Sequence, residues 1–217
     1  MRTICRKPHY AGTINFMRPR LPVVPAIIFI NFLVYLMWVM YPTDFVADNF
    51  LVSWNGLLEG RVWTLLTSAF SHNMFWHFLL NMFVLRSFGP VVEMILGSKR
   101  FLAFYIFASV VSGLGHTLVS AFFLGQPELP ALGASGAISG IILFFSLMFP
   151  KEKILLLGFI PLPALIGALA FVGLDIWGLI AQAGGGGLPI GHGAHLGGAF
   201  AGLLTFLYFR LKPKRIN

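Results

Sequence analysis

Residues 75–96 read FWHFLLNMFVLRSFGPVVEMIL, an apolar stretch that contains one acidic and one basic residue. An α-helix needs about 20 mainly apolar residues to cross a hydrocarbon core of ~30 Å, so this stretch is predicted to span a membrane. The whole chain agrees: 58% of its 217 residues are hydrophobic, and its mean hydropathy is +0.85. Charged residues make up 10%, against about 25% in soluble domains. An ordinary soluble globular protein is therefore excluded.

Five further apolar stretches flank this first span on both sides, and we expect each of them to cross the membrane as a helix. The six expected spans are residues 22–41, 75–96, 101–124, 135–149, 154–182 and 194–209. The fourth and sixth are short and rich in glycine and alanine. The prediction is an all-α membrane protein with a basic tail (1–20), a six-helix membrane domain (21–210) and a second basic tail (211–217).

The basic residues predict how these spans are oriented. The net charge is +8, but the lysines and arginines form short clusters between apolar stretches rather than a face that would bind nucleic acid. With six spans, 13 of the 15 basic residues fall on one side of the membrane, and an excess of Lys and Arg marks the cytoplasmic side. We therefore expect both termini to be cytoplasmic, the lipid bilayer to be a partner, and nucleic acid not to be one.

Polar residues of three predicted spans meet at one depth, in the outer leaflet. His77 and Asn81 lie one helical turn apart, Ser135 begins the fourth span, and His195 lies near the start of the sixth. Polar side chains at membrane depth are costly, so their convergence predicts a functional site. Ser135 at a helix N-terminus has unpaired backbone N–H groups beside it, and an imidazole such as His195 activates a serine by taking its proton. His77 and Asn81 both offer hydrogen-bond donors to an oxyanion.

These residues stand in motifs that resemble the rhomboid family of intramembrane serine proteases. The matching stretches are RVWTLLTSAFSHNMFWHFLLN at 61–81, GASG at 133–136 and GAHLGG at 193–198. The resemblance covers roughly residues 50 to 210 and implies a six-helix rhomboid bundle. In that bundle a short fourth helix carries the serine below a water-filled cavity, and transmembrane protein substrates are cleaved by a Ser-His dyad without a metal or other cofactor.

The resemblance also assigns roles, residue by residue. Ser135 matches the nucleophile and His195 the general base, and together they form the dyad. His77, Asn81 and the backbone at Gly133 match the oxyanion hole.

Several other polar residues receive a structural role or none. Glu93 matches a structural carboxylate, and Ser139, which stands where some members have a tyrosine against the catalytic histidine, is interpreted as a packing residue. An acid within a span, such as Asp175, is able to orient an imidazole as the acid of a triad does, but the dyad resemblance supplies no such role and the interpretation is not favoured. The sequence leaves the roles of Asp175, His192 and Arg86 open.

Two functions from other classes remain as alternatives. The first is a non-catalytic membrane chaperone or trafficking factor with the same fold, which a missing serine or histidine would favour. The second is a metal-ion transporter, but the outer half of the membrane domain offers few carboxylates and no HExxH motif is present. Its ligands would be His72, His77, His116, His192 and His195.

The first span follows a basic tail and has no signal-peptide cleavage pattern after it. For this reason, and because no transit peptide or added domain is recognised, a bacterial inner membrane is the expected location. The only cysteine, Cys5, lies in the first tail, so no intramolecular disulfide is expected.

Overall fold

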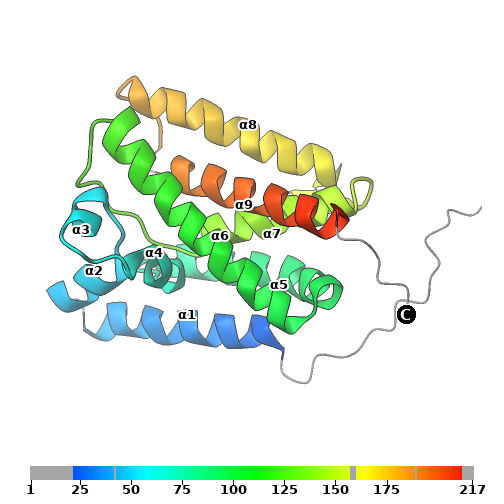
Figure 1. Ribbon diagram of the computed structural model, residues 1–217, viewed down its shortest axis with the longest axis horizontal. Helices are drawn as coiled ribbons and strands as arrows, with labels where there is room; N and C mark the ends of the chain where they lie inside the picture. Colours follow the sequence, from blue (N-terminus) through cyan, green and yellow to red (C-terminus); the bar gives the residue numbers. More distant parts are fainter. Residues whose placement is uncertain (1–21, 42, 157–159, 189, 212–217) are drawn as a thin grey trace, which may run out of the picture.

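The computed structural model describes residues 22–41, 43–156, 160–188 and 190–211, which form a bundle of helices (Figure 1). The two predicted tails, 1–20 and 211–217, lie outside the described residues apart from Leu211. The long helices are α1 (Val23–Met40), α5 (Phe75–Leu96), α6 (Ser98–Leu118, continued by a π-helical turn at Val119–Phe123), α8 (Ala164–Ala183) and α9 (His192–Leu211). The shorter ones are α2 (Asp44–Phe50), α3 (Trp54–Leu58), α4 (Thr64–Thr67), the 3₁₀ turn η1 (Ser68–Phe70) and α7 (Ser135–Met148).

The all-α bundle predicted from hydropathy is confirmed. Five described helices, α1, α5, α6, α8 and α9, are long and apolar enough to cross a membrane. The predicted short helix at Ser135 is α7, which has 14 residues. Within the described residues, each of the six predicted spans overlaps one of these helices.

The fifth predicted span is wrong at its beginning. We expected a helix from residue 154, but Lys153–Leu156 (β1) and Ile160–Pro163 (β2) form an antiparallel hairpin, and α8 begins at Ala164. Pro161 and Pro163 explain the difference, because a proline has no N–H to donate and disfavours helical backbone in the residue before it. Hydropathy alone does not register this, since the hairpin is as apolar as a helix.

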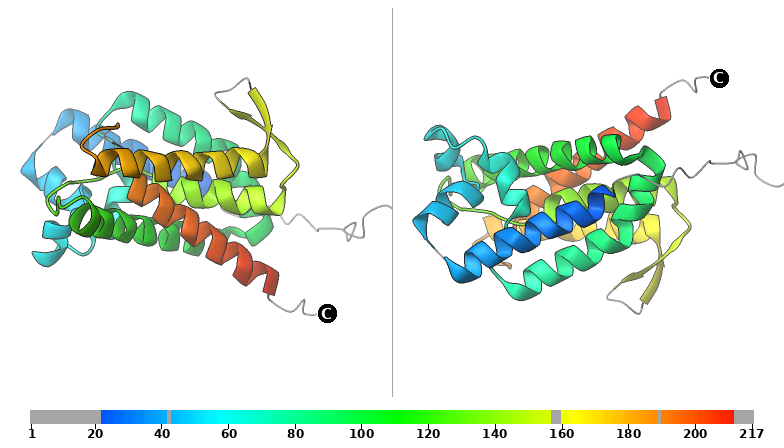
Figure 2. Two further views of the ribbon diagram at one scale, coloured as in Figure 1. Left: turned by 90° about the horizontal axis from the view of Figure 1, so that it is seen from above. Right: turned by 90° about the horizontal axis from the view of Figure 1, so that it is seen from below.

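The short helix α7 occupies the middle of the bundle, where it contacts α5, α6, α8 and α9. Figures 1 and 2 show α1 and α8 on opposite sides of the molecule. Ser135 is the first residue of α7 and therefore lies at one end of this enclosed helix.

The connections at one end of the bundle carry basic residues. Figure 1 shows that α1 begins, α9 ends, and the α5–α6 and α7–α8 connections lie at this same end. Its described basic residues are Lys99, Arg100, Lys151, Lys153 and Arg210. We call it the basic end. At the opposite end lie α2 to α4, where Arg61 pairs with Asp48 and Glu59.

Helices α7 and α9 touch through glycines, which lets their backbones approach closely. A methyl group added at Gly198 would overlap the carbonyl oxygen of Gly136, and one at Gly202 would overlap that of Gly140. A methyl group at Gly140 would lie 2.6 Å from the carbonyl oxygen of Gly198. Small residues at every fourth position are a common means of close helix packing in membranes. These contacts fix the separation between the helix that begins at Ser135 and the helix that contains His195.

The buried carboxylate of Glu93 ties three segments together at the basic end. It accepts hydrogen bonds from the backbone N–H groups of Val23 (2.8 Å) and Val24 (3.1 Å), the first residues of α1, and from the Ser98 hydroxyl (2.7 Å). An acid at a helix N-terminus satisfies N–H groups that have no intrahelical partner. These contacts give Glu93 a structural role.

The fully buried side chain of His72 supports the segment that leads into α7. Its Nε2 accepts a hydrogen bond from the backbone N–H of Ala134 (3.4 Å), the residue before Ser135. Burial, and to a smaller extent the nearby His77, together lower the pKa of His72 from 6.5 to about 3. His72 is therefore neutral at physiological pH, which this bond requires because Nε2 must be unprotonated to accept it.

We expect Gly198→Ala to lower the melting temperature in detergent, because α7 and α9 must separate to admit the methyl group and overpacking costs about 1–3 kcal/mol. The matched control is Gly173→Ala in α8, where an added methyl group meets no atom within 4 Å. This control should melt at the same or a higher temperature, since alanine favours a helix by roughly 1 kcal/mol over glycine. Equal melting temperatures for the two variants would contradict the role of the close contact.

We also expect stability to fall as the pH drops below about 6.5, because the unfolded chain then takes up a proton at His72 that the folded protein does not bind. The loss approaches about 1.4 kcal/mol per pH unit for one such group and continues toward pH 3. His72→Gln removes this contribution and should flatten the dependence. The unfolding midpoint of the wild type and of His72→Gln is measured by intrinsic fluorescence between pH 7.5 and pH 5. If the midpoints of both proteins change with pH in the same way, the contribution of His72 is refuted.

Candidate active site

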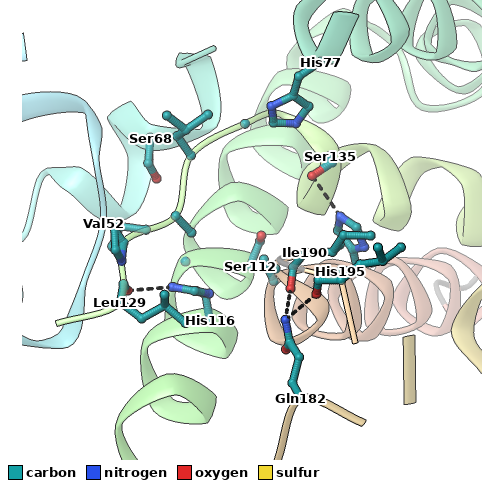
Figure 3. Close-up of a pocket in the computed structure, with 18 of the residues that line it drawn as sticks. Val52, Ser68, His77, Ser112, His116, Leu129, Ser135, Gln182, Ile190 and His195 are labelled. Atoms are coloured by element: carbon teal, nitrogen blue, oxygen red, sulfur yellow. Dashed lines mark hydrogen bonds between the residues drawn. The ribbon is translucent and has the colours of Figure 1, made fainter. Parts of the chain in front are cut away.

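A cavity of about 860 Å³ opens between the helices, and Ser135, His195 and His77 line it together with the segments before α7 and α9 (Figure 3). Ser135 reaches it because the chain turns sharply at Gly133, whose φ of +118° suits glycine. As the first residue of α7, Ser135 has a backbone N–H with no carbonyl partner one turn earlier in the helix. The serine hydroxyl and a helix N-terminus thus meet at the cavity wall.

The structure brings Ser135 and His195 into hydrogen-bond contact. Their Oγ and Nε2 atoms are 2.9 Å apart (Figure 3), and the His195 side chain is 11% exposed. The residues are 60 positions apart in the chain and come from α7 and α9. This distance lets Nε2 accept the hydroxyl proton, which is the first requirement for a serine nucleophile.

His77 lines the same cavity and lies against Gly133. A methyl group added at Gly133 would lie 2.7 Å from Cε1 and 2.9 Å from Nε2 of His77. A side chain at position 133 would therefore displace this imidazole. The ring of His72 packs edge-on against that of His77, with 4.9 Å between centroids.

Two other predicted oxyanion groups are bonded elsewhere. The side-chain amide of Asn81 donates to the carbonyl oxygen of His77 (2.9 Å) within α5, and Asn81 does not line the cavity. The backbone N–H of Gly133 donates to the carbonyl oxygen of Ser68 (2.8 Å). The donors that remain beside the serine are the His77 ring and the N–H groups that begin α7.

Helix α8 contributes a carboxylate that the sequence analysis left without a role. Asp175 Oδ1 lies 2.9 Å from Nδ1 of His195 and 2.7 Å from Nδ1 of His192, and it is 5% exposed as a residue. Phe171, one turn earlier in α8, packs its ring 5.8 Å from that of His195. The sequence did contain a sign of this role, because an acid inside a membrane span indicates a functional residue. The pattern along one helix does not show which histidines of another helix Asp175 contacts.

Two other polar residues near the cavity, Ser139 and His116, have structural partners. The Ser139 hydroxyl donates to the carbonyl oxygen of Ser135 one turn earlier (2.9 Å), so its interpretation as a packing residue is confirmed. His116 Nε2 bonds the carbonyl oxygen of Leu129 (3.0 Å) and so ties α6 to the segment before α7.

The segment between α8 and α9 closes one side of the cavity. The amide of Gln182 donates to the carbonyl oxygens of Leu188 (2.8 Å) and Ile190 (2.9 Å) (Figure 3). Four consecutive glycines lie between Gln182 and Leu188, and two of them, Gly185 and Gly187, have positive φ. One side chain thus anchors a stretch whose backbone has unusual conformational freedom.

Asp175, His192 and His195 are also the described residues whose ligand atoms come closest to forming a metal site. One ligand atom from each lies within 4.8 Å of the others. Two histidines of the transporter alternative, His192 and His195, belong to this cluster, whereas His72 and His116 bond backbone groups elsewhere.

The chain is similar in sequence to several known proteins. The chain is 30% identical over 200 residues to "RHOMBOID-like protein 12, mitochondrial" of Arabidopsis thaliana, covering 87% of this chain and 58% of that protein. It is 32% identical over 193 residues to "Rhomboid protein 1, mitochondrial" of Saccharomyces cerevisiae, covering 85% and 52%. The "Presenilin-associated rhomboid-like protein, mitochondrial" of Homo sapiens is 30% identical over 188 residues, with 85% and 48% covered. The chain spans about half the length of the curated relatives it matches.

These names contradict one expectation. A bacterial inner membrane was predicted, whereas the relatives are mitochondrial proteins by name and point to a mitochondrial membrane. Apolar length and charge asymmetry depend on the physics common to all bilayers, so they identify a membrane protein without identifying its membrane.

A family model described as the Rhomboid domain matches residues 59–212. This range includes His77, Ser135 and His195. The match covers more than half of the chain and includes all three motifs quoted from the sequence after residue 60. The chain belongs to the rhomboid family.

Proposed function

We propose that this chain is an intramembrane serine endopeptidase that cleaves single-span membrane proteins. The observation that carries the proposal is the 2.9 Å contact between Ser135 Oγ and His195 Nε2 beside a cavity within a bundle of membrane helices. A non-catalytic chaperone or trafficking factor with this fold has no need of that contact, so we favour the protease.

The chemistry follows from the positions of these groups. Ser135 Oγ forms a bond to the carbonyl carbon of the scissile peptide while its proton passes to His195 Nε2. The C–N bond then breaks and the same proton passes to the departing amine, which leaves an acyl-serine that a water molecule hydrolyses by the same steps. The N–H groups at the start of α7 and the His77 ring stabilise the oxyanion.

The substrate must unwind near the end of the bundle that is opposite the basic end. A peptide within a membrane helix is protected by its own backbone hydrogen bonds, so glycine or proline near the cut lowers the cost of exposing it. The names of the relatives support a mitochondrial membrane as the location.

The decisive experiment compares three serine and histidine variants on a designed single-span substrate that has an Ala-Gly cut site followed by proline. We expect Ser135→Ala and His195→Ala each to abolish cleavage, because neither member of the pair functions alone. Ser139→Ala is the matched control, since that hydroxyl bonds only the backbone of its own helix, and it should cleave normally. Cleavage products are measured by mass spectrometry, and cleavage by purified Ser135→Ala protein would refute the proposal.

A second pair of variants distinguishes the contributions of His77 and Asn81 to oxyanion stabilisation. His77→Ala should lower kcat by about 10²- to 10³-fold, the usual effect of one lost oxyanion donor. Asn81→Ala should have a smaller effect, because that amide bonds a carbonyl within α5. Steady-state kinetics on the same substrate test this, and equal losses in both variants would mean that Asn81 turns toward the substrate during the reaction.

A further inference from the structure

We propose that Asp175 is a positioning residue, which holds the His195 imidazole in the tautomer and orientation that accept the Ser135 proton. His192 is the second anchor of the same carboxylate. This inference rests on the proposed protease function and deepens it, because it adds a third member from α8 to the pair formed by α7 and α9.

The geometry forms one continuous chain of hydrogen bonds. Asp175 Oδ1 accepts from Nδ1–H of His195 (2.9 Å), and Nε2 of His195 then accepts from the Ser135 hydroxyl (2.9 Å). A neutral imidazole carries its proton on one nitrogen only. A carboxylate at Nδ1 therefore leaves Nε2 unprotonated, and Nε2 is the nitrogen that faces the serine.

Among the described residues, the contacts of the Asp175 carboxylate indicate no other structural role. A buried carboxylate is costly unless its charge is paired or hydrogen-bonded, and the described residues provide Asp175 with two imidazoles and no lysine or arginine partner. Glu93 shows the alternative in the same protein, because its carboxylate bonds backbone N–H groups and a serine. Asp175 instead binds the two histidines that begin α9.

His192 fixes the direction of this carboxylate. Its Nδ1 donates to Oδ1 of Asp175 (2.7 Å), and its ring fills the space over Gly178, where an added methyl group would overlap the imidazole. His192 and Gly178 are both buried. Because His192 and His195 lie one turn apart on α9, they hold the same oxygen atom between them.

The Asp175 carboxylate also has the charge that the reaction requires beside His195. When His195 takes the serine proton it becomes a cation, and the adjacent carboxylate stabilises that cation at the moment the oxyanion forms. Hydrogen bonds to a charged group are worth roughly twice those between neutral groups. Phe171 lies beside the His195 ring and limits its rotation, so the imidazole is constrained by neighbours on both α7 and α8.

The test uses Asp175→Asn and Asp175→Glu in the full chain. We expect Asp175→Asn to lower kcat by about 10- to 100-fold, the factor that corresponds to losing one hydrogen bond to a charged group, while KM changes little. An asparagine amide that donates to Nδ1 favours the proton on Nε2, the wrong nitrogen. Asp175→Glu keeps the carboxylate and should recover part of kcat.

The matched control is Glu93→Gln, which makes the same acid-to-amide change at the other buried carboxylate. It should lower the melting temperature, because Glu93 ties α1 to the α5–α6 connection, and it should leave kcat per folded molecule unchanged. If both variants lose activity only in proportion to the folded fraction, Asp175 is structural and the proposal is wrong.

A spectroscopic measurement keeps the test independent of turnover. In protein with ¹⁵N-labelled histidine, the His195 signals, assigned by their loss in His195→Gln, should report the Nδ1–H tautomer in the wild type and the Nε2–H tautomer in Asp175→Asn. The same tautomer in both proteins, or a wild-type kcat in Asp175→Asn, would overturn the positioning role.

The two proposals fail differently. A wild-type protein that cleaves no substrate and whose Ser135 does not react with a fluorophosphonate would overturn the protease function and the positioning role with it. A wild-type protein that cleaves, together with an Asp175→Asn variant that cleaves equally well, would overturn the positioning role alone.

Discussion

The backbone contact between α7 and α9 is the constraint on which the candidate site depends. Two chain segments 60 residues apart must place an oxygen and a nitrogen at 2.9 Å, and side-chain flexibility alone does not achieve this reproducibly. Glycines remove the side chains that would keep the helices apart, as the pairs Gly136–Gly198 and Gly140–Gly202 demonstrate. The absence of side chains at these glycines is therefore as necessary for the site as the serine and histidine themselves.

Among the described residues, two carboxylates are buried, and the cost of their burial is offset in different ways. Glu93 is satisfied by the unpaired N–H groups at the start of α1, so its cost is offset by a fixed helix end. Asp175 is satisfied by imidazoles, whose bonds depend on which nitrogen carries the proton. One carboxylate is bonded by backbone groups with fixed geometry, whereas the other is bonded by side chains that can carry a proton on either ring nitrogen. This difference underlies the proposed distinction between a structural acid and a positioning acid.

The sequence predicted the features that depend on local pattern. Apolar length located the long helices, and the family motifs identified Ser135 and His195, which the fold brings together. It did not predict the hairpin before α8, because proline geometry and not hydropathy decides that segment. Nor did it predict the bonds of Asp175 or the internal bond of Asn81, since both depend on how one helix is rotated against its neighbours.

Helix α8 is joined to the bundle by a β-hairpin before it and four consecutive glycines after it, while α7 and α9 are joined to each other by backbone contact. Many of its large apolar side chains, among them Leu174 and Trp177, are exposed on the protein surface and so face the acyl chains. The buried Asp175 lies on the face of the same helix that packs against α9. One helix thus combines an apolar outer surface, suited to a hydrocarbon solvent, with a carboxyl group that is sheltered from that solvent.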